Sequence, residues 1–230
     1  MDFPIGEFPY DRDHSAMGEY QCVTEEGYCG NWLDQVCNYT YNGHGPSWIV
    51  TEKDGKHYME SMRIEKNRPH RMFPTLETGG KHWHDYRVSV TLRRLSRKGM
   101  AGIVFCLNHS IDTLVFCLDG RDRAVAAYRH KEEVHILQEA VYPHDCDSEY
   151  RLEAECRDRE AVLRIDGLEV LRIRNDLVQR GGKVGITADC PTRFSDFTAE
   201  VSGETAEAIE EREAWEERRE AEAQAAHPGM

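Results

Sequence analysis

The sequence predicts an all-β fold of two packed antiparallel sheets, followed by an acidic C-terminal α-helix. Between residues 86 and 201, short segments of alternating polar and apolar residues recur roughly every ten residues, which is typical of a sandwich. Turn signals such as Asp166-Gly167 separate these segments. From Gly203 onward the residues are strong helix formers with no breaker before Pro228, so the character of the chain changes there.

Two segments have the clearest strand pattern. Tyr86 to Arg93 places tyrosine, valine and leucine on one face and arginine, serine and threonine on the other. Glu149 to Arg157 repeats this alternation, which indicates two half-buried strands. Ala101 to Leu107 is apolar on both faces, so this strand is expected near the centre of its sheet.

The remaining strands follow from shorter patterns between turn residues. They are expected at Thr113–Leu118, Ala124–Arg129, Val134–Tyr142, Ala161–Ile165, Glu169–Ile173, Lys183–Ala188 and Phe194–Val201. Asp166-Gly167 tolerates the positive φ angles of a tight hairpin. In the first third of the chain, Trp48–Val50 and His57–Glu60 form a second predicted hairpin, and Trp32 with residues 39–41 indicates a further strand.

The chain is expected to contain one domain and one appendage. Its 230 residues fit a single large β domain over residues 1–202, with an irregular lead-in over residues 1–30. Residues 203–230 are interpreted as a helical tail or as a linker to a further domain. Trp215 in this tail suggests a neighbouring domain or protomer as a partner of the 204–225 helix, although a solvated helix is the simpler expectation.

Charge and composition argue against several classes of partner. The formal net charge of -13 repels nucleic acid and anionic membrane surfaces. We find no export signal and no apolar stretch of the length that spans a membrane, so a cytoplasmic location is expected. Because no export signal is found, the eight cysteines are expected to be free thiols. None of them has the CxxC spacing that zinc sites usually need, so a zinc site is not expected.

Six segments in a fixed order carry a family resemblance. They are Trp83-His84-Asp85-Tyr86, Gly102-Ile103-Val104-Phe105, Tyr150 to Glu155, Leu163-Arg164-Ile165-Asp166-Gly167, Gly182 to Ile186, and Phe194-Ser195-Asp196-Phe197. Their order resembles the laminin G-like and related concanavalin A-like jelly rolls, including sandwiches of the 3-keto-disaccharide hydrolase type and several carbohydrate-binding modules. The resemblance covers about half of the chain and implies a jelly-roll sandwich with a concave face and sugars as the commonest ligand class.

The same resemblance implies a structural calcium ion. In such families the aspartate of the closing Phe-x-Asp strand often helps to hold this ion, and the matching position here is Asp196. Calcium needs further oxygen ligands, which the sequence does not place. The alternative is that Asp196 accepts a hydrogen bond from a neighbouring strand or loop.

The sequence lacks the motifs of common hydrolytic enzymes. Retaining sandwich glycosidases carry two carboxylates on one strand in a Glu-x-Asp-x-Glu type pattern, which this sequence lacks. Glu153 and Glu155 do share a strand face, but they are bordered by Arg151 and Arg157 and predict a charge-paired surface. Gly-x-Ser-x-Gly, phosphate-binding glycine loops and His-Glu-x-x-His are also absent. We therefore predict no catalytic residues and lean against an enzyme for this chain alone.

Aromatic and titratable residues gather before the strand at Tyr86. Trp83 offers an apolar surface for the C–H face of a sugar, while His82, His84 and Arg71 are suited to bind hydroxyls or a uronate carboxylate. The two histidines also have a spacing that would let both face a metal. In the simpler alternative, Trp83 caps the core and the histidines lie on the surface. A second candidate loop contributes His44 and Trp48.

Three functions remain open from the sequence. The first is a carbohydrate-binding or accessory module of a saccharide-processing protein, which makes this chain part of a multidomain protein. The second is a lyase or hydrolase of oxidised or uronic-acid sugars, with histidine or tyrosine as the base. The third is a non-catalytic assembly domain that joins protomers through the tail helix.

Overall fold

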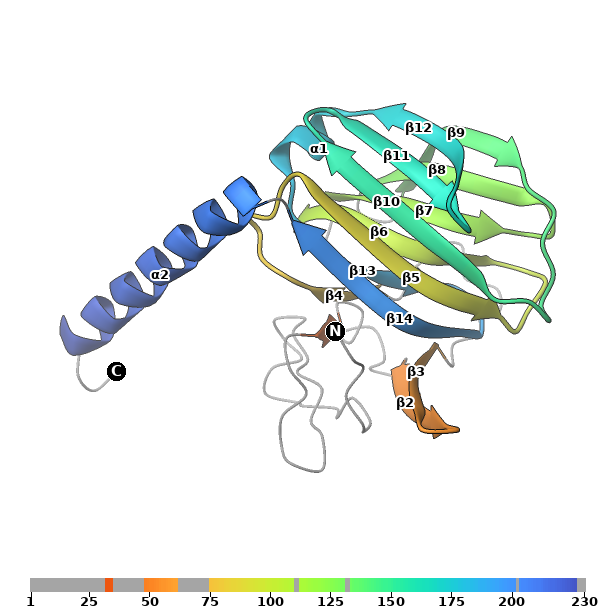
Figure 1. Cartoon of the computed structure of the whole chain (residues 1–230), viewed down its shortest axis with the longest axis horizontal. Helices are drawn as coiled ribbons and strands as arrows, with labels where there is room; N and C mark the ends of the chain where they lie inside the picture. The colour runs from red at the N-terminus through yellow and green to blue at the C-terminus, as the bar shows by residue number, and fades with distance from the viewer. Residues whose placement is uncertain are drawn as a thin grey trace.

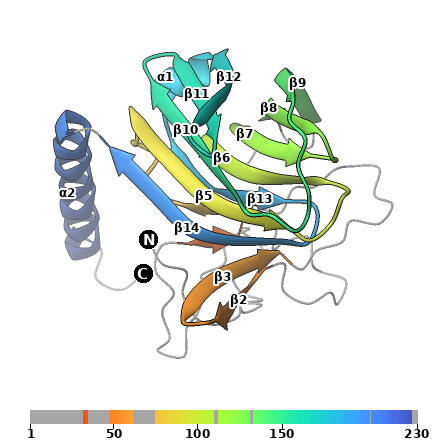
Figure 2. The ribbon, with the colours of Figure 1, turned by 45° about the vertical axis from the view of Figure 1, so that its right-hand side comes forward.

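The chain forms a sandwich of two antiparallel sheets with one helix extending from it (Figure 1). The computed structural model describes residues 32–34, 48–61, 75–109, 112–130, 133–201 and 203–226. The two sheets lie as separate layers over one core, as Figure 2 shows for β5 and β14 against β6 and β13. The all-β sandwich with a C-terminal helix is confirmed.

The first layer, which we call the β6 sheet, has seven described strands. In spatial order these are β1 (Leu33–Asp34), β4 (Thr75–Thr78), β13 (Lys183–Ala188), β6 (Met100–His109), β7 (Asp112–Asp119), β8 (Arg123–His130) and β9 (Glu133–Val141). Strand β6 is the fourth of the seven, which confirms the central position that its apolar faces predict. Strand β4 is missing from the sequence prediction.

The second layer, the β5 sheet, also has seven described strands. Their spatial order is β12 (Leu168–Arg174), β11 (Glu160–Ile165), β10 (Tyr150–Arg157), β5 (Tyr86–Arg94), β14 (Thr192–Val201), β3 (Lys56–Ser61) and β2 (Trp48–Lys53). Both predicted hairpins are present, since β11 pairs antiparallel with β12 and β2 with β3. At their turns, Asp166 and Gly167 have φ angles of 50° and 80°, and Asp54 and Gly55 have 54° and 72°. Such left-handed pairs match the twist of two-residue hairpins.

The alternating strands face the core as predicted. In β5 the side chains of Tyr86, Val88, Val90 and Leu92 are at most 2% exposed, whereas Arg87 is exposed. Trp32 packs edge-on against Phe197, with ring centroids 4.9 Å apart, and so ties the start of β1 to β14. Residues 39–41, predicted as part of the same strand as Trp32, lie outside the described residues.

A short helix, α1 (Asp176–Arg180), connects β12 to β13 and was not predicted. Asn175 caps it by accepting a hydrogen bond from the Leu177 amide, and Gly181 ends it with a φ of 66°. An asparagine N-cap and a left-handed glycine are recognised helix signals, but five residues are too few to show a helical period. Leu177 and Val178 anchor α1 in the core.

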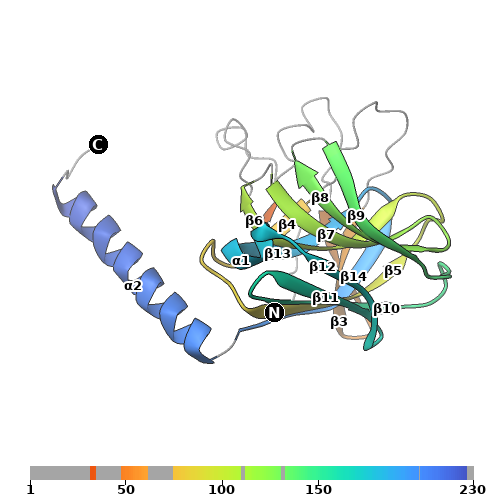
Figure 3. The ribbon, with the colours of Figure 1, turned by 90° about the horizontal axis from the view of Figure 1, so that it is seen from above.

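The predicted tail helix is present as α2 (Gly203–Ala226), which extends away from the sandwich (Figure 3). Thr205 and Ile209 near its start are buried. Trp215 is 43% exposed, and the guanidinium groups of Arg212 and Arg219 lie 4.4 and 5.6 Å from its ring. These cation–π contacts give the tryptophan local partners on its own helix. None of the described helices is both long and apolar enough to cross a membrane.

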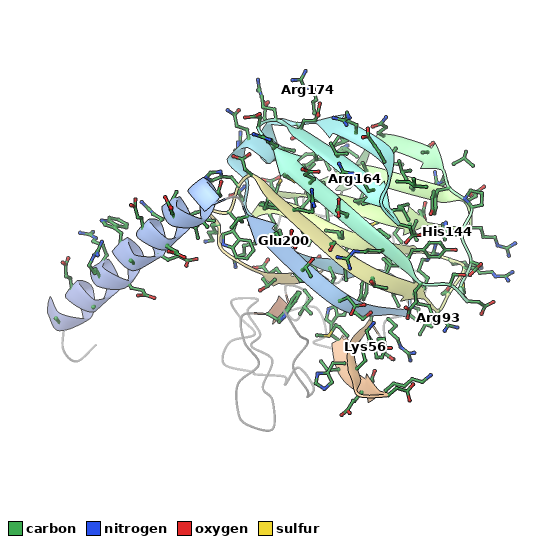
Figure 4. All side chains as sticks on the ribbon, in the orientation of Figure 1. Lys56, Arg93, His144, Arg164, Arg174 and Glu200 are labelled. Atoms are coloured by element: carbon green, nitrogen blue, oxygen red, sulfur yellow. The ribbon has the colours of Figure 1, made fainter. Side chains whose placement is uncertain are left out.

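A buried arginine fixes the turns at the end of the sandwich opposite α1. Arg94, 1% exposed, donates to the carbonyls of Gly99 at 2.9 Å and Gly120 at 2.6 Å and lies 2.6 Å from Nε2 of His144. The other ring nitrogen of His144, which Figure 4 labels, lies 2.8 Å from the Tyr142 carbonyl and donates to it. Burial and the neighbouring Arg94 charge lower the pKa of His144, so the neutral imidazole accepts the arginine proton.

Candidate functional site

The outer face of the β6 sheet is concave. Nη1 of Arg129 on β8 donates to Oγ1 of Thr75 on β4 at 2.9 Å, although β13, β6 and β7 lie between these two strands. In a flat sheet, four strand spacings would separate the strands by about 19 Å. An extended arginine side chain spans less than half of that distance, so the sheet must curve around this face.

The concave face combines an apolar floor with buried charges. The floor consists of Met100, Val104, Leu107, Val115, Cys117, Val125 and Ala127. Above it, Nζ of Lys183 lies 2.7 Å from Oε1 of Glu77, and the Glu77 side chain is only 6% exposed. Burial lowers the pKa of Arg129 to about 10, although the negative charge of Glu77 acts to raise it. Since the side chains of Glu77 and Arg129 are buried, a ligand does not reach them in this structure.

Exposed polar groups lie instead at the end of the sandwich beside α1, which we call the rim. The rim comprises the β4–β5 loop (79–85), the adjoining ends of β6, β7 and β8, and residues 180–183. The Gly182 amide donates to the Trp83 carbonyl at 2.7 Å, and Nδ2 of Asn108 donates to the Gly181 carbonyl at 2.6 Å. Residues 180–183 therefore join the predicted Trp83 segment to the end of β6.

Trp83 is held by glycines on one side and by the core on the other. A Cβ at Gly79 would lie 2.9 Å from Cζ3 of the Trp83 ring, and one at Gly80 would lie 3.1 Å from Cδ1. The ring also packs against the main core cluster and is only partly buried. Trp83 therefore caps the core, as the simpler sequence alternative holds, while the residue as a whole is only partly buried.

The two predicted histidines flank Trp83 at the surface. Nδ1 of His84 lies 3.2 Å from Oδ2 of Asp85, and their side chains are 43% and 40% exposed. Both His82 and His84 are partly buried. Among the described residues no group of three or more histidine, cysteine or acidic side chains is arranged to hold a metal ion. The His84–Asp85 pair is therefore a hydrogen-bonding group at the rim.

A second polar cluster at the rim was not identified from the sequence. Oδ1 of Asp112 at the start of β7 lies 2.7 Å from both Oη of Tyr128 and Nδ1 of His130, at the end of β8. The hydrogen bond to Asp112, together with partial burial, raises the pKa of Tyr128. The ring of His135 stacks on Tyr128 with centroids 6.0 Å apart. The side chains of Asp112 and His130 are 33% and 41% exposed.

This cluster lies on the other side of residues 180–183 from Trp83. Asp112 pairs with His130 across the β7–β8 ladder, and the charge of Arg180 acts on Tyr128. Sequence reasoning missed the cluster because its members belong to separate strand ends. The available signal was the i, i+2 spacing of Tyr128 and His130, which places both side chains on one face of a strand.

The other predicted ligand residues lie elsewhere. Trp48 is fully buried at the start of β2 and packs against Phe194, with ring centroids 5.9 Å apart. Its ring belongs to the core, so expecting it to be an exposed sugar-binding surface was wrong. His44 and Arg71 lie outside the described residues.

Asp196 is engaged by a lysine rather than arranged for calcium. It sits at an irregularity of β14 with a φ of 52°, and Nζ of Lys56 lies 2.7 Å from its Oδ2. Partial burial opposes ionisation, but hydrogen bonds from Lys56 and Ser195 prevail and lower the pKa of Asp196. A hard cation here would displace this ammonium, and the described residues add no acidic cluster. The donor set therefore does not fit a calcium ion.

The Glu153–Glu155 pair is a charge-paired surface, as predicted. Nη1 of Arg164 on β11, labelled in Figure 4, lies 2.8 and 2.7 Å from the two carboxylates. Arg87 on β5 approaches them from the other side at 3.7 and 3.4 Å. The partners come from adjacent strands rather than from Arg151 and Arg157, because cross-strand neighbours are closer than residues two apart on one strand. Hydrogen bonding to Arg164 lowers the pKa of Glu155.

Comparison with known proteins identifies the class of fold. No protein-family model matches the sequence, and no curated protein matches it. Among solved structures, the carbohydrate binding module CBM66 from Bacillus subtilis superposes with a TM-score of 0.52 at 13% identity, over 67% of this chain and 95% of that module. A GH43 protein from Bacillus licheniformis gives 0.54 at 15% identity, over 75% of this chain but 37% of that protein.

A third structure supports the same conclusion. A Bacillus subtilis protein of unknown function with a galectin-like fold gives a TM-score of 0.50 at 12% identity, over 67% of this chain and 86% of that one. Similarity at this level of identity describes the fold alone. The chain therefore has the jelly-roll fold of the concanavalin A-like sandwiches, which confirms the resemblance read from the sequence.

Proposed function

We propose that this protein is a carbohydrate-binding module and that its saccharide binds at the rim. The observation that carries the proposal is the gathering of half-exposed hydrogen-bonding side chains at one end of a sandwich whose fold is shared with a carbohydrate binding module. His84 and Asp85 lie on one side of residues 180–183, and Asp112 and His130 on the other. Sugar hydroxyls both donate and accept hydrogen bonds, which suits mixed carboxylate and imidazole partners.

Trp83 and His82 complete the proposed site. Trp83 is only partly buried, and its ring is suited to an apolar contact with the C–H groups of a sugar. Because its glycine and core contacts hold this ring in place, little side-chain freedom is lost on binding. We further propose that the chain serves a larger saccharide-processing protein, since the GH43 neighbour carries a comparable sandwich within a longer chain.

A glycan array followed by calorimetry with the best oligosaccharide tests this proposal. We expect His84→Ala and His130→Ala each to weaken binding about tenfold, the effect of losing roughly one hydrogen bond to the ligand. Lys53→Ala, at the exposed end of β2, is the matched control and should leave affinity unchanged. No binding to any array sugar at millimolar concentration, or equal affinity in all three variants, would reject a saccharide site at the rim.

A second candidate function is an enzyme acting on oxidised or uronic-acid sugars. The geometry that favours it is the contact of Asp112 with Nδ1 of His130, since a carboxylate that orients an imidazole is the usual arrangement of a general base. Turnover of uronosyl or keto-disaccharides that disappears in His130→Ala would support catalysis. Binding without turnover would leave the first function in place.

Association through α2 remains a separate proposal. Its support is the exposed part of Trp215 on a helix that extends away from the sandwich. Light scattering on the full chain and on a chain ending at Gly203 compares the oligomeric states. An unchanged state after truncation would end this proposal.

A further inference from the structure

Cys106 has an unusual backbone in the middle of the core. It lies on β6 with a φ of 53°, in the left-handed region that residues other than glycine rarely adopt, and it is fully buried. The β6–β7 pairing shifts register between Phe105 and His109, so Cys106 sits in an irregular part of the ladder. The irregularity takes its amide out of regular sheet pairing and turns it toward the opposite sheet.

Tyr86 of the β5 sheet receives this amide. The Cys106 N–H donates to Oη of Tyr86 at 2.7 Å, and this hydroxyl donates to Sγ of Cys106 at 3.5 Å. Tyr86 is 2% exposed, so both hydrogen bonds cross the dry space between the sheets. The tyrosine hydroxyl thereby fixes the position of the Cys106 thiol.

Cys156 occupies the position beside Tyr86 in the β5 sheet. The β10–β5 ladder pairs Glu155 with Arg87, so the next residues along it, Cys156 and Tyr86, lie side by side and both face the core. The charge of Cys156 acts on the Tyr86 hydroxyl, and this hydroxyl contacts Sγ of Cys106, so both thiols lie close to it. Two thiols, one from each sheet, therefore meet at one buried point, and both are free.

We propose that Cys106 and Cys156 are the site of an inter-sheet disulfide. The two thiols would transfer two electrons and two protons to a small-molecule disulfide such as oxidised glutathione, which is reduced to two thiols as the Cys106–Cys156 bond forms. This exchange passes through a mixed disulfide, and the thiolate is the attacking species.

The environment of the pair determines when the bond forms. Burial raises the pKa of Cys156, so the folded protein holds little thiolate there. The thiols are also out of reach of an oxidant in solution. The disulfide therefore forms while the chain folds or opens, and once formed it is shielded from reduction.

Refolding in a glutathione redox buffer tests the proposal. The full chain is unfolded in denaturant with reductant and then refolded in one of two buffers, a mixture of reduced and oxidised glutathione or reduced glutathione alone. The free thiols are then alkylated, and the disulfides are mapped by mass spectrometry. We expect a cross-linked peptide joining Cys106 to Cys156 only in the mixture. Closing a loop of about 50 residues should raise Tm by roughly 10 °C. Folded, reduced protein in the same mixture should form the bond at least tenfold more slowly.

Two variants separate this pair from the other cysteines. Cys156→Ala should abolish the gain in Tm, whereas Cys146→Ala, at a partly exposed cysteine, should retain it. The peptide map of the unmodified chain does not depend on the folding of either variant. Alkylation of both Cys106 and Cys156 after refolding in the mixture, or a bond from either one to a different cysteine, would overturn the proposal.

Discussion

The hydroxyl of Tyr86 is expected to contribute about 2 kcal/mol to the free energy of unfolding. Tyr86→Phe keeps the ring and its packing, so it opens no large cavity. It removes the acceptor of the Cys106 N–H, a hydrogen bond of 2.7 Å between buried groups. A buried amide left without a partner costs roughly 1–3 kcal/mol, and the longer contact to sulfur adds little. For a chain of this size, Tm should fall by about 4–8 °C.

Urea unfolding and calorimetry of the reduced protein measure this effect. Tyr142→Phe is the control, because Tyr142 is partly buried and its hydroxyl makes no hydrogen bond to another described residue. The control should change stability by only a few tenths of a kcal/mol. If Tyr86→Phe were as stable as Tyr142→Phe, the cross-sheet hydrogen bond would not carry the energy assigned to it here.

Three further predictions concern the rim, the opposite end and the metal. Gly181→Ala should lower the free energy of unfolding by about 3 kcal/mol, since the new Cβ would lie 2.0 Å from the Trp83 carbonyl oxygen. Gly120 also has a positive φ but has open space around it, so Gly120→Ala should lower it by only about 1 kcal/mol, and thermal unfolding compares the two variants. The lowered pKa of His144 means that the unfolded chain binds its proton more readily. The stability that depends on neutral His144 is therefore fully present above about pH 6.5 and is lost as the pH falls through the lower pKa of the folded state. Urea unfolding at about pH 7.5 and 5 should show a smaller loss of stability in His144→Gln than in the unmodified chain. Millimolar calcium or EDTA should leave Tm unchanged, because Lys56 engages Asp196; a calcium-dependent rise would contradict this.

Local patterns were enough to predict most of the sandwich. The alternation in Tyr86 to Arg93 and the Asp166-Gly167 turn depend only on neighbouring residues, and both were confirmed. Strand β4 was missed because Thr75-Leu76-Glu77-Thr78 is short and three of its residues are polar. These polar side chains are buried by contacts with distant strands, which a local pattern does not contain.

The site was only partly predictable for the same reason. The segment His82-Trp83-His84 was found because its residue types stand out within three positions. The Asp112–Tyr128–His130 cluster was missed because it forms only when β7 pairs with β8, which places Asp112 beside His130 although they are far apart in the sequence. Trp48 was misjudged because nothing in its glycine-rich surroundings shows that its ring packs on Phe194.

The central claim is that a saccharide binds at the rim, and an NMR titration tests it most directly. Isotope-labelled full chain is titrated with the oligosaccharide selected by the array, and amide shifts are followed by position. We predict that the largest changes fall on residues 79–85 and 180–183 and at Asn108, Asp112 and His130. Changes confined to the charge-paired face around Arg87 and Arg164, or an unchanged spectrum at millimolar sugar, would contradict the account.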